Sequence, residues 1–193
     1  MRHQNQFDSR QGIAQLPGRR SNELGFTLIE LLIVVAIILV IAAIAIPNFL
    51  RSRMAANQAA AVASVRTITT ASVVYNSMWN NGYPPTLASL GGPSSAVASC
   101  DQAILLDEII TTPPNAKSGY TFAYTGEDGA MPTQPANCGS PGFNGYLVTA
   151  VPEILGQTGT NSYCSYTPGV IHFDVTGSPA TSETTCDALP TLQ

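Results

Sequence analysis

The sequence predicts an α+β fold in which one long helix packs on a small antiparallel β-sheet. Two patterns support this prediction. A helical pattern extends over about 54 residues from Phe26, and beyond Gly82 several short runs alternate apolar with polar residues and end at turn residues. The chain has 193 residues, which suits one domain of ordinary size with an appendage.

The first half of the helix is apolar from Phe26 to Ile46, apart from one Thr and one carboxylate, Glu30. About 21 residues at 1.5 Å each extend about 32 Å, enough to cross a bilayer core of about 30 Å. We therefore expect a transmembrane helix over residues 26–47. The polar segment 1–25 has no apolar region of its own, so it is not the front of a standard signal peptide.

The second half of the helix, residues 48–81, is expected to be amphipathic and to pack against the domain that follows. Pro47 separates the two halves and should loosen the turn before it, because proline lacks an N–H and its ring crowds the helix. Asn81-Gly82 and the two prolines after it end the pattern. The apolar stripe of this half contains Ala61, Val65, Ile68, Tyr75 and Trp79.

Residues 82–193 are expected to form a globular, β-rich domain outside the cytoplasm. The segments between its apolar runs are rich in Pro, Gly, Ser and Thr, which suggests long loops between three or four antiparallel strands. A short helix is expected between Cys100 and Thr111. The alternating runs that predict strands are Gly119–Gly126, Gly145–Glu153 and Gly169–Gly177.

All four cysteines, Cys100, Cys138, Cys164 and Cys186, follow the apolar segment. None has the CxxC spacing of a zinc site, so we expect no metal and two disulfides in an oxidising compartment. Three connectivities are possible, and we expect the neighbours in sequence to pair, Cys100 with Cys138 and Cys164 with Cys186. Because Arg residues flank both ends of the apolar run equally, the cysteines rather than the charges indicate the orientation.

No catalytic group is visible, so we expect the chain not to be an enzyme and to need no cofactor. The one candidate base outside the leader is His172, and no nucleophile motif accompanies it. The carboxylates at Asp107–Glu108 suit a solvated helix face, and those at Glu127–Gly129 suit a turn. Beyond Arg66 the only basic residue is Lys117, among many acids, which argues against a nucleic-acid partner.

The stretch "GFTLIELLIVVAIILVIAAIAIPNF" strongly resembles the N-terminus of type IV prepilins and the related pseudopilins. The matching residues are Gly25, Phe26, Glu30 and Pro47. The motif itself covers about 25 residues, and the long helix with a cystine-bearing α+β domain extends the resemblance more loosely to the rest. The leader is longer than the usual short basic one.

This resemblance implies a precursor in the inner membrane whose leader, residues 1–25, is cytoplasmic. Prepilin peptidase would cleave between Gly25 and Phe26 and methylate the new amino group. Assembly machinery in the inner membrane would then stack the subunits into a helical homopolymer on the cell surface, a pilus, with Glu30 paired to the Phe26 ammonium of a neighbour. The alternatives are a pseudopilin of a type II secretion or DNA-uptake system, and a membrane-tethered binding domain that never polymerises.

Overall fold

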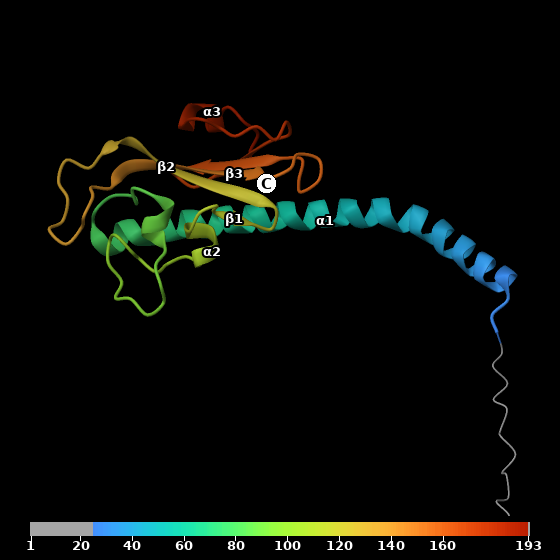
Figure 1. Cartoon of the computed structure of the whole chain (residues 1–193). Helices are drawn as coiled ribbons and strands as arrows, with labels where there is room; N and C mark the ends of the chain where they lie inside the picture. The colour runs from blue at the N-terminus through green and yellow to red at the C-terminus, as the bar shows by residue number, and fades with distance from the viewer. Residues whose placement is uncertain (1–24, 193) are drawn as a thin grey trace, which may run out of the picture. The chain divides into compact units, whose positions relative to one another are not determined.

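The computed structural model describes residues 25–192; residues 1–24, with Arg19 and Arg20 of the leader, lie outside them. The chain divides into two compact units at the Ala42–Ala43 boundary. Helix α1 (Leu28–Trp79) begins in the first unit and ends in the second (Figure 1). All five strands of the sheet come after it in the sequence and belong to the second unit.

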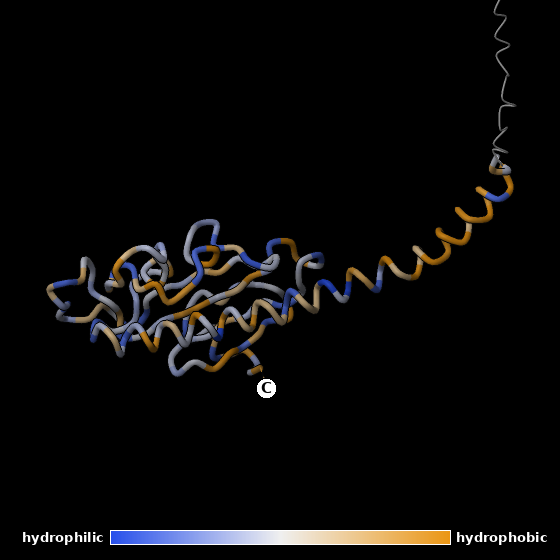
Figure 2. The backbone as a smooth tube through the Cα atoms, turned by 90° about the horizontal axis from the view of Figure 1, so that it is seen from below, coloured by the Kyte–Doolittle hydropathy of each residue, from blue (hydrophilic) through white to orange (hydrophobic). Residues whose placement is uncertain are grey.

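The first unit consists of the apolar half of α1. Every Leu, Ile and Val between positions 28 and 46 is exposed, and Leu28 reaches 87%. Figure 2 shows this half of the helix as mostly orange, hydrophobic tube, with a short blue segment near its start. Its length and composition suffice to cross a membrane, as the sequence predicts. Burying so much apolar surface requires lipid or other protein chains.

The second half of α1 carries the expected buried stripe. Ala61, Val65, Ile68 and Tyr75 are all fully buried, and Trp79 is half-buried at the helix end. The Tyr75 hydroxyl donates a hydrogen bond to the Cys100 carbonyl at 2.8 Å, which ties the helix to the loop beyond it. The 3.6-residue period therefore identified the face that packs on the domain.

The α+β architecture is confirmed, with a five-stranded antiparallel sheet in the order β1-β2-β3-β4-β5. Central strand β3 is buried on both faces: Tyr146 and Val148 belong to the core with α1, while Leu147 packs with the C-terminal segment. Figure 1 shows α1 on one face of the sheet and α3 on the other. The bounds are β1 (Ala116–Lys117), β2 (Tyr120–Ala130), β3 (Phe143–Pro152), β4 (Ser162–Tyr166), β5 (Ile171–Asp174) and α3 (Glu183–Asp187).

Two expectations about the sheet are wrong. Strand β4 lies where a long loop was expected. It pairs with β3 and β5, and its side chains are buried on both faces, Tyr163 in the core with α1 and Cys164 in the core with Cys186. Glu127–Gly129 is not a turn between strands but part of β2. There the register with β3 shifts, and Asp128 and Gly129 have positive φ angles of 59° and 78°, which makes the segment a bulge.

The expected helix between Cys100 and Thr111 is also shorter than the pattern suggests. Only α2 (Glu108–Thr111) forms, because the Asp107 side chain caps it by accepting the Ile109 N–H at 3.2 Å. Upstream, the segment expected to be a loop contains the 3₁₀ helix η1 (Leu87–Leu90).

Both disulfides join sequence neighbours, Cys100 to Cys138 and Cys164 to Cys186. The second links β4 to α3 and lies in a small core on the sheet face opposite α1, together with Leu147. It therefore fastens the C-terminal segment to the sheet.

Candidate functional site

The second unit holds no group of side chains suited to catalysis among the residues described. His172 is buried, and its Nδ1 lies 2.7 Å from the Leu189 carbonyl oxygen, so it holds the C-terminal segment to β5. Across residues 25–192 no cluster of His, Cys, Asp or Glu could hold a metal ion.

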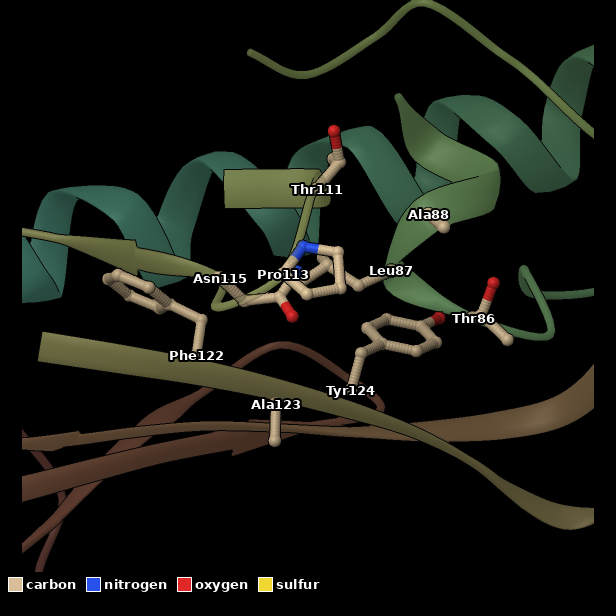
Figure 3. Close-up of a pocket in the computed structure, with 9 residues that line it drawn as sticks. All are labelled: Thr86, Leu87, Ala88, Thr111, Pro113, Asn115, Phe122, Ala123 and Tyr124. Atoms are coloured by element: carbon tan, nitrogen blue, oxygen red, sulfur yellow. The ribbon is translucent and has the colours of Figure 1, made fainter. Parts of the chain in front are cut away.

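A surface hollow of about 310 Å³ lies between η1, the α2–β1 connection and β2 (Figure 3). Phe122 and Tyr124 project from one face of β2 toward Leu87 and Pro113, while Ala123 points to the other face. Its lining contains no acid, base or thiol. The hollow is therefore a gap between packed elements rather than a reactive site.

Glu30, the carboxylate that the sequence predicts to act in assembly, lies in the first turn of α1. Thr27 is the residue before the helix, and its N–H donates to Glu30 Oε2 at 3.0 Å. Its hydroxyl donates to the same oxygen at 2.6 Å, and the Glu30 N–H in turn donates to Thr27 Oγ1 at 3.3 Å. This reciprocal arrangement is a capping box, and it satisfies backbone donors that a helix start leaves unpaired.

The resemblance to prepilins implies an intermolecular role for Glu30, whereas its local pairing with Thr27 was not predicted. The signal was present, because Thr-x-x-Glu before an apolar run is the capping-box pattern. A carboxylate in the first turn also interacts favourably with the positive end of the helix dipole. Glu30 thus has a local structural role that needs no neighbouring subunit.

Gly25 and Phe26 precede the capping box and are exposed among the described residues. Phe26 is 80% exposed. A Cβ placed on Gly25 would meet no atom within 4 Å. A larger residue at position 25 would therefore meet no described atom.

Pro47 lies inside α1, and the helix continues through it without a break. Its missing N–H leaves the Ala43 carbonyl without the usual helical partner. Arg51 and Arg53 follow within two turns and are exposed. Among residues 25–192 the single ion pair joins Lys117 to Asp107 at 3.8 Å, so neither of these Arg side chains has an acidic partner there.

Four acids gather instead at the end of β2 and on α3. Burial raises the pKa of Glu183 above its ordinary value, and the charges of Asp128, Glu127 and Asp187 raise it further. Like charges accumulate here with no described cation among them. The surface is therefore unsuited to nucleic acid.

Comparison with known proteins agrees with these features. Residues 20–46 match the family described as the prokaryotic N-terminal methylation motif. The type IV wide pilus major component PilA4 of Thermus thermophilus is 44% identical over 69 residues, which cover 36% of this chain. The matched region spans about half the length of that relative, 52%. No solved structure matches the chain significantly.

A methylation motif at the head of an exposed apolar helix, continued by a helix packed on an antiparallel sheet, is consistent with a type IV pilin-like α+β fold. The chain carries this motif at residues 20–46 and is similar to a type IV pilin over 69 residues. The predicted resemblance to prepilins is thus confirmed by the motif match, which includes Gly25, Phe26 and Glu30 and ends just before Pro47.

Proposed function

We propose that the chain is the structural subunit of a type IV pilus, polymerised through the N-terminal half of α1. The observation that carries this proposal is the exposure of every Leu, Ile and Val side chain between Leu28 and Ile46. In the precursor they would face lipid, and in a filament they would face the same helices of other subunits. Similarity to the major component of a wide pilus supports the filament role.

Processing would precede assembly. Prepilin peptidase cleaves between Gly25 and Phe26 and methylates the new amino group, which removes residues 1–25. The accessibility of Gly25 and Phe26 supports this step. The capping box survives it, because the N–H that Thr27 donates is a peptide N–H on either side of cleavage.

Glu30 would then set the register between subunits. Only Oε2 takes part in the capping box, and among the described residues no group bonds Oε1. That oxygen is free to meet the Phe26 ammonium of a neighbour. At about 4 Å, two unit charges attract by about 4 kcal/mol at an effective dielectric of 20. This offsets the cost of about 2.5–3.5 kcal/mol for an acid in a membrane helix.

Pro47 would allow the subunit to lengthen on assembly. Because Pro47 has no N–H, the helix around it has one backbone hydrogen bond fewer. Residues 42–49 are therefore the part of α1 that unfolds into extended chain most readily. An unbroken helix at these residues in a filament map would contradict this step.

Filaments sheared from cells provide the test. We expect mass spectrometry to identify this chain as an abundant filament subunit beginning at N-methylated Phe26, with cleavage lost when the peptidase is removed. A processed chain that is scarce and confined to the inner membrane with secretion or DNA-uptake machinery would indicate a pseudopilin. An uncleaved chain that stays in the membrane would indicate a tethered binding domain.

A further inference from the structure

A mixed basic and apolar patch surrounds the point where α1 leaves its apolar half. We call it the Arg51 patch, and all of its side chains belong to the second unit. Ile154 and Leu155, in the loop between β3 and β4, are 52% and 58% exposed although both are large and apolar. Leu50, Arg53 and Ile154 line one surface hollow, and their chain neighbours Phe49, Arg51 and Leu155 complete the patch; all six are exposed.

The β3–β4 loop is held against α1 rather than projecting freely. The Asn57 side-chain amide donates to the Thr158 carbonyl at 3.0 Å, and the Gln58 amide donates to Thr160 Oγ1 at 2.7 Å. The loop closes on itself through the Gly156 N–H and the Gly159 carbonyl at 2.8 Å. Figure 1 shows this orange loop at one end of the sheet, beside α1. Its apolar tip is therefore fixed next to the helix.

The position of the patch along α1 corresponds to the headgroup layer of a bilayer. The apolar run ends at Ile46, and at 1.5 Å per residue Arg51 lies about 8 Å beyond it and Arg53 about 10 Å. The headgroup layer adds about 5–8 Å to each side of the hydrocarbon core, so Arg51 lies at its outer limit and the long Arg53 side chain can reach back into it. Arg66, by contrast, lies about 30 Å beyond Ile46.

The charge of the patch also suits phospholipid. Arg51 and Arg53 are cations without an acidic partner among residues 25–192, on a domain whose other charges are mainly acidic. The acid in the same loop is Glu153, which is exposed and would oppose binding to an anionic surface. Arg and apolar side chains together form the usual composition of a surface that lies in the membrane interface.

We propose that, before assembly, the Arg51 patch docks the globular unit on the outer surface of the membrane that anchors it. Arg51 and Arg53 bind phospholipid phosphates, and Ile154 and Leu155 insert at the boundary between headgroups and acyl chains. This inference rests on the membrane anchoring in the proposed function and adds a second contact with the lipid. Docking would hold the unassembled subunit in one orientation, and extraction into a filament would release it.

Tryptophan fluorescence of the full-length chain in vesicles tests the docking. The protein has one Trp, Trp79, which lies about 50 Å along α1 from Ile46 and provides a constant background. Leu155→Trp adds a second at the loop tip. In vesicles containing anionic phosphatidylglycerol and a brominated phospholipid, we expect strong quenching in the Leu155→Trp chain and almost none in the parent chain.

Charge variants made in the Leu155→Trp chain identify the lipid contact. Arg51→Gln with Arg53→Gln should lower the ratio of docked to undocked chains about 25-fold, about fivefold for each charge. The matched control, Arg66→Gln, removes an exposed Arg far from the bilayer and should leave quenching unchanged. Glu153→Gln should increase quenching. Millimolar inorganic phosphate should not release the loop, whereas replacing the anionic lipid with a zwitterionic one should weaken docking.

Absence of quenching at the loop tip in inserted chains would overturn the proposal. Quenching that depended on the ratio of protein to lipid would also overturn it, because the patch would then be a contact between copies. Either result leaves the proposed function standing, since that function is judged by whether filaments contain the chain. Conversely, cells without such filaments would refute the pilus role without affecting quenching in vesicles.

Discussion

Replacing Glu30 with Gln separates the capping role of this side chain from its proposed pairing with a neighbour. Gln is a capping-box residue of nearly the same size, so the helix start should persist. Even complete loss of a cap costs only about 1 kcal/mol. The lost charge pair is worth about 4 kcal/mol at about 4 Å and an effective dielectric of 20. A subunit contact weaker by that amount binds about a thousandfold less tightly.

The matched control is Thr27→Val, which keeps the charge and removes the hydroxyl that bonds Glu30 at 2.6 Å. We expect Glu30→Gln to insert and be cleaved normally but to give few or no filaments, as should Glu30→Leu. Thr27→Val should give filaments at close to the parental yield. The assay is the yield of sheared filaments beside an immunoblot of precursor and mature chain.

Normal filaments from fully processed Glu30→Gln would refute the register role. Purely apolar packing predicts that outcome, because removing a buried charge should strengthen a bundle of helices. An equal loss of filaments in Thr27→Val and Glu30→Gln would show that the capping box, rather than the charge, matters for assembly.

Three further changes have outcomes that follow from the structure. Gly25→Val should fold, since a Cβ there meets no atom within 4 Å, yet it should retain its leader; a normal amount of chain starting at Phe26 would contradict this. Replacing both Cys164 and Cys186 with Ser opens a link across 22 positions and should lower the free energy of unfolding by about 3 kcal/mol; an unchanged denaturant midpoint would argue against it. Burial raises the pKa of Tyr124 above its ordinary value of about 10, so the folded chain binds a proton that the unfolded chain loses, and stability should fall as pH rises above about 10. Absorbance should then report tyrosinate from Tyr124 only as the domain unfolds, and its ionisation near the ordinary pKa in a folded domain would be inconsistent with burial.

The long helix was predictable because its signals are local and repeated. The apolar run, the stripe from Ala61 to Tyr75 and the Asn81-Gly82 stop each specify part of α1 (Leu28–Trp79) without reference to the rest of the chain. The helix start was misplaced by two residues because Thr27 was counted as helix, although its pairing with Glu30 makes it the cap.

Strand β4 was not predictable in the same way, because tertiary contacts rather than local preference stabilise it. Ser162–Tyr166 lacks a clear alternation of apolar and polar residues. Tyr163 belongs to the core with α1, whereas Cys164 faces the opposite core with Cys186. Burial on both faces removes the period of two that reveals a half-buried strand. The Arg51 patch was missed for a related reason, since Arg53 and Ile154 are brought together only by folding.

A high-resolution map of filaments assembled from this chain tests the central claim most directly. The account predicts residues 26–47 in the filament core, with the carboxylate of Glu30 within about 4 Å of the Phe26 amino group of an adjacent subunit. A map in which this half of α1 lies outside the core, or in which Glu30 contacts no neighbouring amino group, would contradict it.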